Sequence, residues 1–123
     1  MQATTAITWF EIPAKDLERA VWFYESVLQQ ELRRETMGPA AMAVFPYQDP
    51  GVGGALTHAP NLKPAADGSI IYLRTQRLDE TLERVTRAGG RIVLDKTALP
   101  DGMGAFAHIV DCEGNRIGLH ALD

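Results

Sequence analysis

The chain contains little that would place it outside a reducing compartment. Cys112 is its single cysteine, so no internal disulfide forms and a cysteine-rich zinc site is excluded. No apolar run is long enough to span a bilayer, and the first residues lack the basic start and long apolar stretch of a signal peptide. These absences predict a cytoplasmic protein that has no membrane partner.

Basic clusters are also missing. The net charge is −4, and no group of Lys and Arg is interleaved with aromatic residues. A polyanion would be repelled by such a chain rather than attracted to it, so nucleic acid is not an expected partner. The remaining composition, 46% hydrophobic and 23% charged over 123 residues, is typical of one globular domain.

A strand followed by a helix occurs twice in the sequence. The first copy predicts a strand over 6–12 and a helix over 17–28 that is capped by Asp16. The second predicts a strand over 69–73 and a helix over 78–88. Three short strands are predicted after each copy: 30–36, 43–47 and 53–57, then 91–94, 106–110 and 116–120. We therefore expect a single domain of two modules, about 5–57 and about 69–121, joined by a connector at 58–68.

Three motifs carry a family resemblance: the run DLERAVWFY at 16–24, the helix end RAGG at 87–90, and the turn DCEGN at 111–115. Together they resemble the vicinal oxygen chelate superfamily, which includes glyoxalase I, bleomycin and fosfomycin resistance proteins, and extradiol dioxygenases. Cys112 stands where that family usually has proline. The resemblance implies an α+β fold of paired βαβββ modules whose sheets curve around a cleft, often within a homodimer.

The resemblance also implies a divalent metal, held by His, Gln or Glu from the first and last strands of each module. Counting back from Asp16 places the first ligand position on Trp9, and the same count in the second module falls on Ile70. The acidic position of the last strand falls on Gly118, and residues 53–57 include no Asp, Glu, His or Gln. None of these side chains binds a metal. We therefore expect the usual metal site to be absent and no cofactor to be bound.

Strand alternation predicts which side chains line the cleft, because residues two apart in a strand share a face. A shift of one residue in the alignment with the family pattern could bring Glu11 or His120 to a ligand position, but it would turn that side chain away from the cleft. The expected ligand-binding residues are Trp9, Glu11, Tyr72, Phe106, His108, Arg116 and His120. They predict an aromatic cleft that contains a few charges.

Trp9 and Glu11 each have a structural and a functional interpretation. Trp9 is either a stacking surface for a planar ligand or part of the core, and the sequence favours neither. Glu11 is expected to pair with Arg74 or Arg116 in preference to acting as a general base. If the protein is an enzyme, Glu11 and His108 are the candidate catalytic residues.

The remaining cleft residues also have structural alternatives. His108 and His120 are expected to be satisfied by neighbours in preference to forming a metal or acid–base site with Glu11. Tyr72 and Arg116 either orient a carboxylate or carbonyl of a ligand or lie at the rim of the cleft.

Two functional hypotheses follow. The first is a metal-independent module that binds a small aromatic or amphipathic molecule, as the bleomycin resistance branch does. The second is a metal-dependent lyase or dioxygenase of glyoxalase type, with a displaced site built from Glu11, His108 and His120. A third hypothesis, a protein-interaction domain that uses the outer helices, has only generic charged faces to support it.

Overall fold

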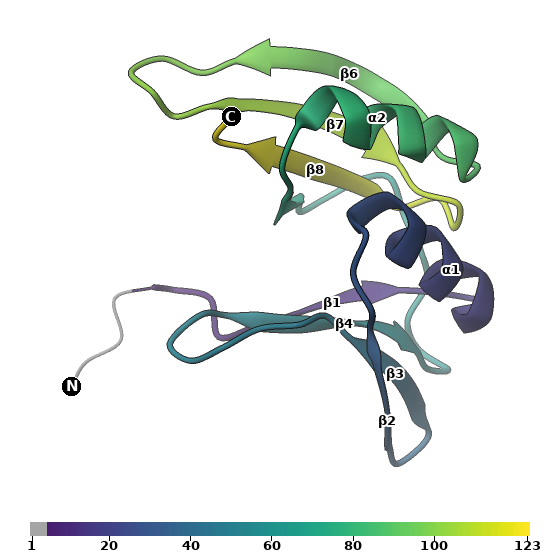
Figure 1. Ribbon diagram of the computed structural model, residues 1–123. Coiled ribbons are helices and arrows are strands. Elements are labelled where there is room, and N and C mark those ends of the chain that lie inside the picture. Colours follow the sequence, from purple (N-terminus) through teal and green to yellow (C-terminus); the bar gives the residue numbers. More distant parts are fainter. Residues whose placement is uncertain (1–4) are drawn as a thin grey trace.

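The computed structural model describes residues 5–123 as two sheets of four strands, each with one helix (Figure 1). The first module contains β1 (Trp9–Pro13), α1 (Leu17–Leu28), β2 (Arg33–Met37), β3 (Ala40–Val44) and β4 (Gly53–His58). The second contains β5 (Ile71–Arg74), α2 (Leu78–Arg87), β6 (Arg91–Ala98), β7 (Ala105–Val110) and β8 (Arg116–Ala121). The predicted α+β fold of paired βαβββ modules is confirmed.

Several predicted strand limits are wrong. The first strand begins at Trp9 rather than at residue 6, and β3 covers 40–44 rather than 43–47. A tight turn at Gly38, where φ is +57°, sets Met37 opposite Ala40 and so moves β2 and β3 toward each other in sequence. The strand predicted over 91–94 extends to Ala98, because its polar second half continues as an edge strand with two register shifts.

Both sheets have the same strand topology. Their orders are β1-β4-β3-β2 and β5-β8-β7-β6, and the only parallel pairs among the described strands are β1 with β4 and β5 with β8. Side chains alternate between the two faces of each strand. One face of each sheet therefore packs against a helix, while the other face is left open to form a cleft.

The helix-facing sides of both sheets share one hydrophobic core. Phe23 and Tyr24 of α1 lie in it together with Leu56 of β4, Val85 of α2 and Leu119 of β8, all fully buried. The two helices contact each other, so the core continues from one module into the other. Neither helix in the described part of the chain is long and apolar enough to cross a membrane.

The turn between β7 and β8 joins the second module to the first. The Tyr24 hydroxyl donates to Asp111 Oδ2 at 2.5 Å, and Asn115 Nδ2 donates to the Pro13 carbonyl at 2.8 Å. Asp111 Oδ1 in turn accepts from the backbone N–H of Glu113 and of Asn115. These contacts fix the turn from within and attach it to both α1 and the end of β1.

Glu113 completes this attachment at the start of α1. Its carboxylate accepts from the backbone N–H groups of Lys15 and Asp16 and from the Arg19 guanidinium, and its side chain is 1% exposed. Burial alone would raise the pKa of Glu113, but the hydrogen bonds from Asp16, Arg19 and Lys15 outweigh it and hold the pKa below its ordinary value. The carboxylate is thus charged at neutral pH and faces the positive end of the helix dipole.

Glu113→Gln should lower the free energy of unfolding by about 2 kcal/mol at neutral pH, because the variant removes the charge from a buried carboxylate that accepts several hydrogen bonds. Chemical denaturation measures this change, with Glu83→Gln on the exposed side of α2 as the matched control. Since the folded-state pKa of Glu113 is lowered, its contribution is present at neutral pH and is lost as the pH falls through that pKa. A loss no larger than that of the control would contradict the role of Glu113 in joining the modules.

Candidate functional site

The open face of the second sheet gathers most of the predicted ligand-binding side chains. Tyr72 of β5 pairs across Gly118 of β8 with His108 of β7. One row further along, Arg74 pairs across His120 with Phe106. Residues paired across strands share a face, so the alternation argument correctly placed these side chains together.

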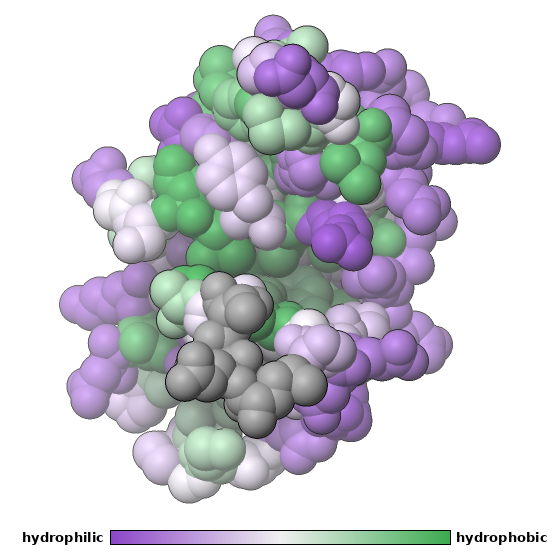
Figure 2. Space-filling model, turned by 90° about the vertical axis from the view of Figure 1, so that its left-hand side faces the viewer, coloured by the Kyte–Doolittle hydropathy of each residue, from purple (hydrophilic) through white to green (hydrophobic). Residues whose placement is uncertain are grey.

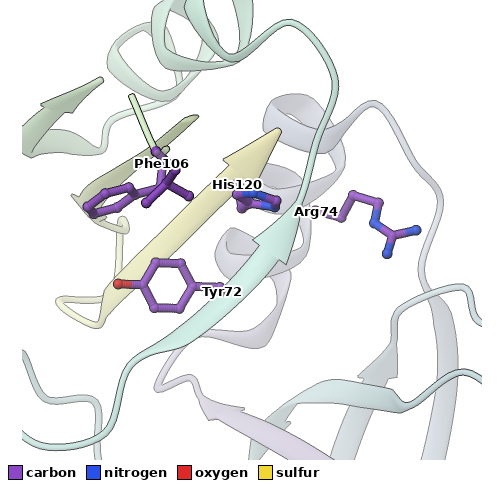
Figure 3. Close-up of a pocket in the computed structure, with 5 residues that line it drawn as sticks. Tyr72, Arg74, Phe106 and His120 are labelled. Carbon is purple, nitrogen blue, oxygen red and sulfur yellow. The ribbon is translucent and has the colours of Figure 1, made fainter. Parts of the chain in front are cut away.

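A cavity of about 390 Å³ lies on this face. Its lining residues are Tyr72, Arg74, Leu99, Phe106 and His120. Figure 3 shows the rings of Tyr72 and Phe106 on one side of His120, and the Arg74 side chain reaching away on the other side. The cavity is therefore aromatic at one end and cationic at the other.

The loop between β6 and β7 forms one wall of the cavity. His120 Nε2 donates to the Met103 carbonyl at 2.6 Å, and the Leu99 N–H donates to the Gly104 carbonyl at 2.8 Å. Leu99 was not predicted as a site residue. The signal that could have found it is the register of the last hairpin, which sets Ala105 opposite Ala121 and so brings the preceding loop to His120.

His108 is held between two other predicted site residues. Its Nε2 lies 2.6 Å from the Tyr72 hydroxyl oxygen, and its Nδ1 accepts from Arg116 Nε at 3.2 Å and from Arg116 Nη2 at 3.0 Å. Burial and the nearby Arg116 charge lower the pKa of His108. The histidine is satisfied by neighbours, as predicted, and it is neutral at pH 7.

Gly118 gives Tyr72 its position. A Cβ atom at residue 118 would lie 2.3 Å from Cδ2 of the Tyr72 ring, so the ring occupies the space that any side chain at 118 would need. Position 118 is where the family resemblance implies an acidic metal ligand. The Tyr72 ring therefore fills the space in which a side chain at that position would lie.

The residues at the other implied ligand positions do not fit a metal either. The indole Nε1–H of Trp9 is only a donor, and here it donates to Glu11 Oε2 at 3.3 Å. Within residues 5–123, no group of three or more His, Cys, Asp or Glu side chains lies close enough to hold a metal ion. Since both nitrogens of His108 are already engaged, a displaced site of Glu11, His108 and His120 does not assemble within one chain.

Trp9 and Glu11 lie apart from the cavity, on the open face of the first sheet. Trp9 is 38% exposed and meets the ring of Tyr47 edge-on, with 6.1 Å between the ring centroids. The expected ion pair of Glu11 with Arg74 or Arg116 is wrong: Glu11 is exposed beside Trp9, and Arg116 turns to His108. The expected pair would have to bridge the two sheets, and strand alternation carries no information on how two sheets are placed relative to each other.

A second, larger cavity of about 810 Å³ lies between the modules. Its walls include Phe10 and Phe45 from the first module, and Gln76 and Arg84 from the second. Tyr72 and Arg74 line this cavity as well as the smaller one. Figure 2 shows apolar surface gathered in the hollow between the two halves of the molecule.

The thiol of Cys112 is unsuited to nucleophilic catalysis. Burial and the neighbouring Asp111 and Glu113 charges raise its pKa to about 11, so it is protonated at neutral pH. The site thus offers aromatic surface, one exposed guanidinium and a connected set of hydrogen bonds, and this composition suits ligand binding.

Comparisons with known proteins agree with this fold. The model of the Glyoxalase/Bleomycin resistance protein/Dioxygenase superfamily matches residues 6–119. A glyoxylase-like domain-containing protein of Didymella fabae is 31% identical over 117 residues, which cover 89% of this chain and 88% of the other.

Two solved structures illustrate the range of similar folds. Glyoxalase I from Zea mays has a TM-score of 0.69 at 23% identity over 93% of this chain, which spans only 45% of the maize chain. The fosfomycin resistance protein FosX from Listeria monocytogenes has a TM-score of 0.67 at 16% identity, covering 97% of this chain and 91% of the other.

Gly118→Ala should destabilise the protein by about 1 to 3 kcal/mol or displace the Tyr72 ring, because the added methyl group overlaps that ring. Adding Tyr72→Ala in the same chain should recover most of the loss, since it removes the overlapping atoms. Thermal unfolding of the two single variants and the double variant measures the coupling. Additive effects of the two substitutions would show that the ring does not occupy this space.

Proposed function

The chain belongs to the glyoxalase/bleomycin resistance protein/dioxygenase superfamily, and from that premise we propose that it binds a small amphipathic molecule without the superfamily's usual divalent metal. The ligand has an aromatic or apolar body and an anionic group. The observation that carries this proposal is the cavity on the second sheet, where the exposed ring of Tyr72 and the half-buried ring of Phe106 lie beside the exposed guanidinium of Arg74.

The aromatic end supports a planar ligand body. Tyr72 is 50% exposed, and its ring meets the ring of Phe106 at 6.1 Å between centroids with an interplanar angle of 65°. Rings in such an arrangement offer both a face and an edge to a third ring. A volume of about 390 Å³ admits a substituted benzene or naphthalene ring system.

The cationic end supports an anionic group on the ligand. Arg74 is exposed, and no carboxylate among the described residues forms an ion pair with it. A guanidinium binds a carboxylate through two parallel hydrogen bonds. Arg74 therefore favours an anion at the end of the cavity opposite the aromatic rings.

Binding without turnover accounts for these side chains better than catalysis does. The implied metal positions carry Trp9, Ile70 and Gly118, none of which supplies a ligand atom. Cys112 is protonated, and both nitrogens of His108 are engaged by neighbouring side chains. We therefore infer a role in sequestering or sensing the molecule.

The cavity is open on one side, and we propose that a second copy of the chain covers it. The first module exposes Ile7, Trp9 and Met37, which are 57%, 38% and 70% exposed. The second exposes Tyr72 and Leu122, which are 50% and 71% exposed. A homodimer in which the open face of one first module covers the partner's second module would bury these apolar side chains and enclose the ligand.

Arg74→Gln should weaken the binding of para-isopropylbenzoate about fivefold, because it removes one partly solvated charge-assisted contact worth about 1 kcal/mol. An amide NMR titration measures the affinity and locates the site. The uncharged para-isopropylbenzamide should bind wild type and variant equally. Arg87→Gln, on the exposed side of α2, is the matched control and should bind the benzoate as wild type does.

Trp9→Asp should shift the protein from dimer toward monomer and weaken binding of the same benzoate, since it places a charge in the proposed contact between copies. Sedimentation equilibrium across a range of concentrations measures the assembly. A wild-type protein that stays monomeric at the highest concentrations would contradict the dimer and leave binding to the cavity of a single chain as the proposal.

A further inference from the structure

Three side chains on the open face of the second sheet form a directed hydrogen-bond chain from Arg116 through His108 to Tyr72. We propose that this chain fixes the Tyr72 hydroxyl as a hydrogen-bond donor to the ligand, so that the cavity selects molecules with an acceptor, such as a carbonyl oxygen, at the aromatic end. The inference rests on the proposed function and adds the chemical class of a second ligand group.

The first step is the direction of the bond between Arg116 and His108. A guanidinium only donates, so the His108 Nδ1 that lies 3.0 Å from Arg116 Nη2 and 3.2 Å from Nε is an acceptor. A neutral imidazole carries one proton, which must then be on Nε2. Arg116 therefore fixes the tautomer of His108.

The second step follows for Tyr72. Its hydroxyl oxygen is 2.6 Å from His108 Nε2, and with the proton on Nε2 the tyrosine is the acceptor in this contact. The phenolic hydrogen is left without a partner among the described residues, and Tyr72 lines the cavity. A ligand oxygen that accepts this hydrogen completes the chain.

The third step is the rigidity of the donor. The Tyr72 ring lies against Gly118, where a Cβ would come within 2.3 Å of it, and meets the rings of His108 and Phe106 at 5.4 and 6.1 Å between centroids. Because the ring is held on these sides, its hydroxyl has a defined position. Donating a hydrogen bond to a ligand therefore costs little additional conformational entropy. Gly118 therefore contributes to recognition, because its lack of a side chain leaves room for the Tyr72 ring.

The arrangement is also sensitive to pH. The groups that face His108 are Arg116 from β8, Tyr72 from β5, the uncharged Leu94 from β6 and Phe106 on its own strand, with no carboxylate among them. Protonation of His108 would put a proton on Nδ1, which could then no longer accept a hydrogen bond from the Arg116 guanidinium. The series of hydrogen bonds from Arg116 to Tyr72 would be broken. Burial and the Arg116 charge lower the pKa of His108. The series of hydrogen bonds is therefore intact at neutral pH and is lost as the pH falls through that lowered pKa.

Two probes of nearly equal shape test the proposal. Para-acetylbenzoate carries a carbonyl acceptor where para-isopropylbenzoate has only carbon, and both carry the carboxylate for Arg74. Wild type should bind the acetyl probe about fivefold more tightly at about pH 8, and this preference should vanish in Tyr72→Phe. Tyr47→Phe, which removes an exposed hydroxyl outside the smaller cavity, should keep the preference.

The variant His108→Gln tests whether residue 108 acts by orienting the Tyr72 hydroxyl, because glutamine can make the same hydrogen bonds but does not titrate. The amide supplies one acceptor for Arg116 and one donor for Tyr72, so the acetyl preference should survive. The preference of this variant should also stay constant as the pH is lowered from about 8, whereas wild type should lose it as the pH falls through the lowered pKa of His108. Imidazole nitrogen NMR of wild type should place the proton on Nε2.

The outcomes are distinct. Binding of both probes with no acetyl preference, or with a preference that persists in Tyr72→Phe, overturns this inference and leaves the proposed function intact. An imidazole proton on Nδ1 overturns it as well. If neither probe binds, the proposed function itself fails, and the inference fails with it.

Discussion

The turn at 111–115, whose Asp111 and Asn115 are buried, is the contact on which the rest of the structure depends. Asp111 binds both the Tyr24 hydroxyl and the turn's own backbone, while Asn115 binds the end of β1. Burial and the Asp111 charge raise the pKa of Tyr24 well above its ordinary value, so the hydroxyl stays protonated and continues to donate. This turn directly precedes β8, so it also fixes where Gly118 and His120 lie relative to the first module.

This constraint explains why the two open faces remain free. The turn and the shared core join the modules on their helix sides, which leaves the opposite face of each sheet without a partner among residues 5–123. Apolar side chains that would ordinarily be buried, such as Trp9 and Tyr72, are therefore exposed on these faces. The same packing that stabilises the fold thus creates the surface on which the proposed ligand and the proposed second copy meet.

Residue patterns were enough to predict the two modules and one face of the site, and the family resemblance implied the fold that contains them. Two copies of one strand–helix pattern predicted the paired modules, and strand alternation placed Tyr72, His108 and Arg116 together because a period of two is a local property. The ion pair predicted for Glu11 was wrong because it depended on how two sheets sit relative to each other. Leu99 was missed for a similar reason, since its place in the cavity depends on a loop held to the sheet by His120.

The family resemblance implies an acidic metal ligand at position 118, where this chain has a glycine covered by the Tyr72 ring. A carboxylate there would project into the space that the Tyr72 ring now fills, so the two arrangements exclude each other sterically. A divalent metal attracts ligand oxygens as a Lewis acid, and a phenolic hydroxyl attracts them as a hydrogen-bond donor. The hydroxyl contributes far less electrostatic stabilisation to a reacting group than a metal does, but it still discriminates acceptors from apolar groups. In the proposed function, such a cleft would keep selectivity for an oxygen without the metal that is the strongest source of catalysis, which is the physical reason for proposing binding without turnover.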